Sequence, residues 1–200
     1  MTRDPHPKFD PNKHHRKSIR LQGYDYSQAG AYFVTIVTYQ RDCLFGKIEN
    51  EEMLLNDFGK IADECWLAIP EHFPNVELGA HVIMPNHVHG VVVICDDESA
   101  SHLGTTDDGR RGAALLRPYD DDNTHKINVK PGSLGAIVRS YKSAVSYRIN
   151  KEHNATGIWQ RNYYEHIIRS ADEANRIHLY IEANPAQWDD DDENPSNNRG

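Results

Sequence analysis

The segment HVIMPNHVHGVVVI at residues 81–94 constrains the fold of this chain most strongly. Apolar runs flank Pro85 and Asn86, which are residues of tight turns, so the segment predicts two strands joined as a hairpin. Side chains alternate across a strand, so His87 and His89 share one face. Two neutral imidazoles side by side form half of a divalent-metal site, here at the mouth of the hairpin where a ligand can reach them.

Hydrophobic periodicity divides the rest of the chain into strands and amphipathic helices. Runs of β-branched and aromatic residues predict strands, whereas apolar residues three and four apart predict helices. In chain order we expect a strand at 31–38, a helix at 52–69 ended by Pro70, strands at 76–84 and 87–94, a helix at 133–150 with Ser133 as N-cap, a strand at 163–168, and a helix at 171–184 stopped by Pro185. The order β-α-β-β-α-β predicts an α+β, ferredoxin-like fold, in which one antiparallel sheet has its helices on one face and a C-terminal helix is left to cross the sheet.

The composition predicts one domain with polar segments outside its core. Only 38% of the 200 residues are hydrophobic, which is low for a compact domain of this length. We assign residues 1–22 to a basic flexible arm, 23–188 to the domain, about 96–130 to an acidic loop inserted in it, and 189–200 to an acidic tail. No apolar run approaches the roughly 20 residues of a membrane span, and no signal region precedes the domain, so we expect a cytoplasmic protein.

Charge is distributed unevenly along the chain. The net charge of -8 argues against a nucleic-acid partner, but the average conceals two basic stretches. Residues 1–48 hold eight Lys and Arg against four acids, and residues 130–170 hold seven against two. This segregation is compatible with a basic groove on an otherwise acidic protein. The alternative, a set of solvated charged faces, remains open at this point.

Five segments of the chain occur in the order that a known family shows. They are RLQGYDYSQAGAYFVTIVT, HVIMPNHVHGVVV, IVRSYKSAVSYRIN, IWQRNYYEHIIRS and YIEANPAQW. Together they resemble the REP-associated tyrosine transposases of the single-tyrosine HUH superfamily, with Val88 as the hydrophobic residue of HUH. The resemblance covers roughly residues 19–195. It implies a ferredoxin-like fold, binding of hairpin-forming single-stranded DNA, and cleavage and rejoining of strands at REP-like sequences through a 5'-phosphotyrosine, with Mg²⁺ or Mn²⁺.

The resemblance also implies a role for four residues. The family's nucleophile is the tyrosine of YIxxNP, which is Tyr180, on the C-terminal helix. A helix-borne amide one turn later is the family's third metal ligand beside the two histidines, and this position is Asn184. Residues four apart share a helix face, so Tyr180 and Asn184 would point the same way. A cation held by His87, His89 and Asn184, all uncharged, would keep its full electrophilic strength toward a phosphate.

Other residues are secondary candidates. Tyr163 and Tyr164 lie in an expected strand and suit packing, and Tyr147 on the basic helix suits DNA contact. His81, His166 and Gln160 could position groups at the site. The candidates for contacts with the DNA backbone are the cations of the second basic stretch, namely Arg139, Lys142, Arg148, Arg161 and Arg169.

Two alternatives are enzymes of another class. A histidine-triad hydrolase requires a third His at the next alternate position, where this chain has Val91. An amidohydrolase-type barrel also starts with HxH but requires roughly 250 residues. A third alternative is a domesticated protein that binds DNA hairpins without cutting them. The sequence leaves that choice open, as it does the choice between a monomer and a homodimer.

Overall fold

The computed structural model describes residues 24–96 and 129–197, so most of the expected arm and acidic loop lie outside the described residues. Its main sheet has four strands, β1 (Gly30–Val37), β4 (Val76–Ile83), β5 (His87–Ile94) and β6 (Tyr164–Ile168). They lie in the order β4-β5-β1-β6, and every neighbouring pair is antiparallel. This confirms the predicted α+β class with an antiparallel sheet, in the strand order of a split βαβ unit.

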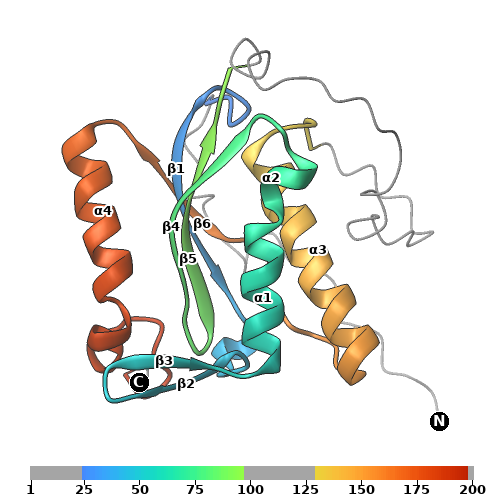
Figure 1. Cartoon of the computed structure of the whole chain (residues 1–200), viewed down its shortest axis with the longest axis vertical. Helices are drawn as coiled ribbons and strands as arrows, with labels where there is room; N and C mark the ends of the chain where they lie inside the picture. The colour runs from blue at the N-terminus through green and yellow to red at the C-terminus, as the bar shows by residue number, and fades with distance from the viewer. Residues whose placement is uncertain (1–23, 97–128, 198–200) are drawn as a thin grey trace, which may run out of the picture.

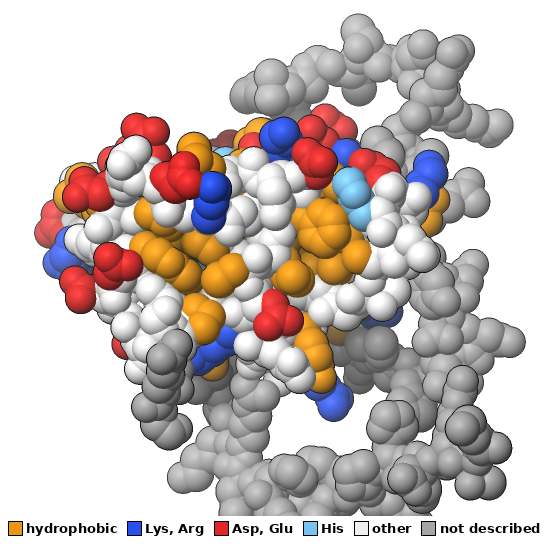
Figure 2. Space-filling view, turned by 90° about the horizontal axis from the view of Figure 1, so that it is seen from below, with side chains coloured by type: hydrophobic (Ala, Val, Ile, Leu, Met, Phe, Trp, Pro, Cys, Tyr) orange, Lys and Arg blue, Asp and Glu red, His pale blue; other side chains and the backbone are white. Residues whose placement is uncertain are grey.

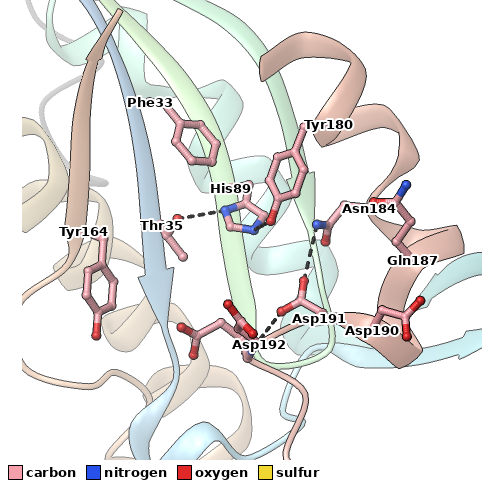
Figure 3. Close-up of a pocket in the computed structure, with 11 residues that line it drawn as sticks. Phe33, Thr35, His89, Tyr164, Tyr180, Asn184, Gln187, Asp190, Asp191 and Asp192 are labelled. Atoms are coloured by element: carbon pink, nitrogen blue, oxygen red, sulfur yellow. Dashed lines mark hydrogen bonds between the residues drawn. The ribbon is translucent and has the colours of Figure 1, made fainter. Parts of the chain in front are cut away.

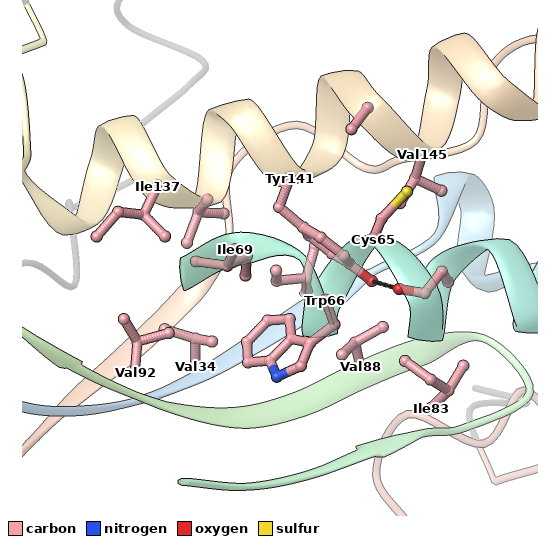
Figure 4. Close-up of a cluster of buried hydrophobic side chains, with 14 of the residues drawn as sticks. Val34, Cys65, Trp66, Ile69, Ile83, Val88, Val92, Ile137, Tyr141 and Val145 are labelled. Atoms are coloured by element: carbon pink, nitrogen blue, oxygen red, sulfur yellow. Dashed lines mark hydrogen bonds between the residues drawn. The ribbon is translucent and has the colours of Figure 1, made fainter. Parts of the chain in front are cut away.

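Three helices, α1 (Asp57–Leu67), α2 (Ile69–His72) and α3 (Leu134–His153), cover one face of the sheet (Figure 1). The core lies between this face and the helices (Figure 4), where the Trp66 and Tyr141 rings meet edge to face with centroids 5.2 Å apart. Gly90 is required beneath Trp66, since a Cβ on Gly90 would lie 2.2 Å from the Cζ2 atom of the indole. The tight contact holds β5 against α1.

The expected helix at 52–69 is wrong at its beginning. Glu52–Leu55 forms strand β3, which pairs with β2 (Gly46–Glu49) in a separate hairpin. Helix α1 begins only after Asn56, whose Oδ1 accepts from the Gly59 amide at 3.0 Å. Pro70 does not end the helical stretch but lies in the first turn of α2, where its missing N–H costs no hydrogen bond.

The β2–β3 hairpin lies at the lower end of the molecule as drawn in Figure 1. Seen from that end, hydrophobic side chains gather in patches with charged groups around them (Figure 2). Tyr39 and Leu54 are among the exposed large apolar residues. Neither hairpin strand was expected from the sequence.

Helix α4 (Ala171–Ala183) lies on the face of the sheet opposite to α1 and α3 (Figure 1). It begins at Ser170, whose hydroxyl accepts from the Glu173 amide at 3.2 Å, and its buried residue is Ile181. A short 3-10 helix, η3 (Pro185–Asp190), follows it. Within the described part of the chain, no helix is long and apolar enough to cross a membrane.

Candidate functional site

Strand β5 places two histidines on the face that α4 covers. His87 and His89 are buried, and their ring centroids lie 4.4 Å apart. The alternation along β5 puts the neighbouring Val88 in the core beneath α1, as the period of two predicts. The two histidines follow the turn at 84–86 that joins β4 to β5, as expected. Their imidazoles, however, are buried rather than open to solvent.

The Nδ1 atom of each histidine has a hydrogen-bond partner. Nδ1 of His89 lies 2.9 Å from the hydroxyl of Thr35, its cross-strand neighbour on β1. Nδ1 of His87 lies 2.9 Å from Oδ1 of Asn86. Asn86 Nδ2 donates to the carbonyl oxygens of Arg41 and Glu193, so Oδ1 is left as the acceptor and His87 Nδ1 is the donor. The Nε2 lone pair of His87 therefore faces inward, in the pattern of metal-binding histidines held by outer partners.

Helix α4 brings the predicted tyrosine and amide beside His89 (Figure 3). The Tyr180 hydroxyl lies 3.2 Å from Nε2 of His89. Asn184 is buried, and its Nδ2 donates to Asp191 at 3.3 Å. Among the described residues, neither Asn184 Oδ1 nor His87 Nε2 has a hydrogen-bond partner. The four residues singled out in the sequence thus share one site, and two of its buried acceptors are unpaired.

Asp191 adds a carboxylate that the sequence analysis did not foresee. His87, His89 and Asp191 each offer one ligand atom, and these atoms lie within 4.8 Å of one another. The Asp191 side chain is only 5% exposed. Residues 189–197, assigned to the acidic tail from the sequence, are held against the fold here, since Arg41 pairs with Glu193 at 3.1 Å. A carboxylate therefore lies beside the three uncharged groups expected from the sequence.

The arrangement suits a divalent cation. Two imidazole nitrogens, an amide oxygen and a carboxylate are donors for Mn²⁺ or Mg²⁺, and an unpaired buried acceptor is costly unless a cation or donor satisfies it. Burial lowers the pKa of His87 and of His89 to about 3, so both are neutral and able to bind a metal. Burial, and next the nearby charge of Asp191, raise the pKa of Tyr180, which keeps this phenol protonated in the free protein.

The site opens into a cavity of about 540 Å³. Tyr164 lines it from β6, opposite Tyr180 (Figure 3), and is 40% exposed, so the packing role expected for Tyr164 is wrong. The secondary candidates His81 and His166 are engaged elsewhere, by Asp63 at 2.8 Å and Glu173 at 2.7 Å.

The predicted DNA-binding cations do not form one group. Arg139, Lys142 and Arg161 line a second cavity beside α3. Arg148 instead pairs with Glu64 of α1 at 2.7 Å and with Glu152 at 3.3 Å. Arg169 lies at the junction of β6 and α4. On α3, Arg139 and Lys142 therefore face the second cavity, whereas Arg148 faces α1.

Sequence comparisons find curated relatives of this chain. No family model matches the chain. An uncharacterised protein of Haemophilus influenzae is 37% identical over 189 residues, covering 92% of this chain and 96% of its own. A second protein of that organism, provisionally named a REP-associated tyrosine transposase, is 26% identical over 165 residues, covering 82% and 74%.

A solved structure has the same fold. It is a REP-associated tyrosine transposase bound to a REP hairpin, with a TM-score of 0.51 at 17% identity, covering 85% of this chain and 74% of that one. In its ordered motifs, in a named curated relative and in its antiparallel fold, the chain is similar to the REP-associated tyrosine transposases.

Proposed function

We propose that this protein nicks and rejoins single-stranded DNA beside hairpin-forming, REP-like sequences, with Tyr180 as the nucleophile. The supporting observation is the Tyr180 hydroxyl 3.2 Å from His89 Nε2, beside the unpaired acceptors of His87 and Asn184. A phenol next to a cluster of buried, metal-binding groups is the arrangement that phosphodiester cleavage through tyrosine requires.

His87, His89 and Asn184 would hold the cation, and the Asp191 carboxylate lies within reach of the same position. Bound Mg²⁺ or Mn²⁺ would supply Lewis-acid polarisation of the scissile phosphate. Thr35 and Asn86 orient the two imidazoles by fixing Nδ1 of each ring. Because His87 and His89 are neutral, the Asp191 carboxylate would offset part of the cation's charge, and Asp190, Asp192 and Glu193 line the same cavity.

The Tyr180 oxygen would attack phosphorus, and the bond from phosphorus to the 3' oxygen would break. The strand upstream leaves with a free 3' hydroxyl, while the 5' phosphate of the strand downstream stays on the tyrosine. Attack by a 3' hydroxyl on this ester reverses the reaction, so rejoining requires no ATP. The hydroxyl loses its proton on attack, and its raised pKa means that nearby positive charge is required to favour the phenolate.

The experiment that tests this proposal detects the covalent ester. A 3'-labelled hairpin oligonucleotide with a single-stranded flank is incubated with the protein and Mn²⁺, then run on a denaturing gel. We expect a labelled protein band, and mass spectrometry should place the DNA on the peptide that contains Tyr180. Tyr180→Phe should give no band, whereas Tyr164→Phe, in the same cavity, should give the full band. An adduct on Tyr164, or one that persists in Tyr180→Phe, would contradict the proposal.

Two further variants separate this function from hairpin binding without turnover. His87→Ala or His89→Ala should abolish the adduct but leave hairpin affinity largely intact, because phosphate contacts from Lys and Arg supply most of the affinity. Full nicking in EDTA would refute the metal site. A wild-type protein that binds the hairpin and never forms an adduct would establish the binding-only alternative.

A further inference from the structure

A second cavity, of about 800 Å³, lies between the outer face of α3 and the segment 155–163. Its size is that of a pocket for a small organic group. Three cations and three aromatic residues line it, namely Arg139, Lys142, Arg161, Tyr147, Trp159 and Tyr163. No Asp or Glu is among its described lining residues. In a protein with a net charge of -8, such a lining indicates an anionic, aromatic ligand.

The positive charge of this cavity is not neutralised by the fold. Lys142 Nζ donates to the carbonyl oxygens of Gln160 at 2.6 Å and Asn162 at 3.0 Å. An ammonium has three N–H donors, so one is left for a ligand. Within residues 24–96 and 129–197, Arg139 and Arg161 form no ion pair, in contrast to Arg148. Burial lowers the pKa of Lys142 to about 8, and a bound phosphate would favour its charged form.

The aromatic groups of the cavity suit a nucleobase. Trp159 is fixed by a hydrogen bond from its Nε1 to the Lys142 carbonyl at 3.1 Å, and the Lys142 ammonium lies 6.0 Å from the ring centroid. Tyr147 is 53% exposed, so its ring is available for stacking without disturbing the core. Stacking on such rings, combined with cations for the backbone, is how proteins bind unpaired bases.

Two consecutive residues of the chain line this cavity and the cavity beside Tyr180. Tyr163 lines this cavity, and the next residue, Tyr164, lines the cavity of Tyr180. Tyr164 is the first residue of β6 and Tyr163 precedes it, and β6 is an edge strand of the main sheet. A DNA strand that crosses this edge would therefore reach both cavities.

We propose that the cavity beside α3 binds an unpaired nucleotide of the DNA strand that Tyr180 cleaves. The base stacks against Tyr147 and Trp159, and the phosphate contacts Lys142 with Arg139 or Arg161. The inference rests on the proposed function for the identity of the strand. The cavity would be a second recognition site, which binds single-stranded DNA beside the hairpin. It is separate from the residues proposed to hold the cation.

The test measures binding without catalysis, in EDTA and in a Tyr180→Phe background, so it does not depend on cleavage. Two probes are compared, a hairpin with a single-stranded flank and the same hairpin without it. Tyr147→Ala should weaken binding of the flanked hairpin roughly fivefold or more and leave the blunt hairpin unchanged, since one stacked base is lost. Tyr147→Phe keeps the ring and should bind normally. Tyr39→Ala removes a similarly exposed tyrosine elsewhere and should also bind normally.

A second variant probes the phosphate contact. Arg139→Gln combined with Arg161→Gln removes both candidate contacts and should weaken binding of the flanked hairpin selectively, as Tyr147→Ala does. Equal loss on both probes, or no loss on either, would overturn the proposal. Tight binding of a free deoxynucleoside monophosphate to the wild-type protein would also overturn it, because the occupant would then be a small molecule. The proposed nuclease function fails on different grounds, by the absence of a Tyr180 adduct.

Discussion

Mild acid should destabilise the free protein through the two histidines of the site. His87 and His89 are buried, and burial lowers the pKa of each to about 3. In the unfolded chain both imidazoles have an ordinary pKa of about 6.5. The unfolded state therefore binds two protons that the folded state does not bind, and stability is lost as the pH falls from about 6.5 towards 3.

The size of this effect follows from the two pKa values. At about pH 5.5 an unfolded histidine is roughly nine-tenths protonated, whereas either buried histidine stays neutral. Relative to about pH 7, each histidine lowers the free energy of unfolding by about 1.25 kcal/mol, and the pair lowers it by about 2.5 kcal/mol. For a protein of this length, the melting temperature then falls by about 5 to 10 °C.

Thermal melts followed by circular dichroism in EDTA, at about pH 7 and about pH 5.5, measure this loss. His87→Gln with His89→Gln removes both titrating groups, so this variant should lose about 2.5 kcal/mol less than the wild type over the same interval. His178→Gln, at an exposed position on α4, should keep the full wild-type response. If the double variant shows the same pH dependence as the wild type, the two buried histidines are not the cause.

Three further outcomes follow from the structure. Mn²⁺ at about a hundred times its Kd for the wild type should stabilise the protein by about 2.7 kcal/mol in the same melts. If the same Mn²⁺ concentration stabilised Asp191→Asn equally, this carboxylate would be excluded as a ligand. Arg139→Glu should weaken binding of the flanked hairpin and reduce its salt dependence in a titration with NaCl. Arg148→Glu should mainly lower the melting temperature, since it breaks two ion pairs. Gly90→Ala should cost about 1–3 kcal/mol or more in urea unfolding, because the new methyl group overlaps Trp66; unchanged stability would mean that the indole moves freely.

The local part of the fold could be predicted from the sequence. The alternation around His87 and His89 gives the two faces of β5, and the Ser133 cap of α3 is confirmed, with its hydroxyl accepting from the Ala136 amide. The segment 52–55 could not be assigned by the same means. Its apolar residues Leu54 and Leu55 fit a helical spacing and a short strand equally well. Pairing with Gly46–Glu49 decides between them.

The candidate site was predictable only where a motif marks it. HVH and YIEANP identify the histidines, the tyrosine and the amide, whose proximity in space the structure then provides. Asp191 belongs to a run of acids that gives no period and no turn pattern, so nothing local distinguishes it from Asp190 or Asp192. Contacts between segments distant in sequence position Asp191. Arg41 forms an ion pair with the Glu193 carboxylate, and the Asn86 amide donates to the Glu193 carbonyl oxygen.

Asn86 is the residue at which these distant segments meet. One end of its side chain must accept a hydrogen bond from His87, while the other donates to the carbonyl oxygens of Arg41 and Glu193. Aspartate could accept but could not donate, and an apolar side chain of the same size could do neither. An amide at this buried position therefore fixes the tautomer of His87, a proposed metal ligand, and holds the chain segment that positions Asp191. Through these three hydrogen bonds, the positions of His87 and Asp191 depend on the folding of the C-terminal segment. The sequence PNHVH alone does not indicate this dependence.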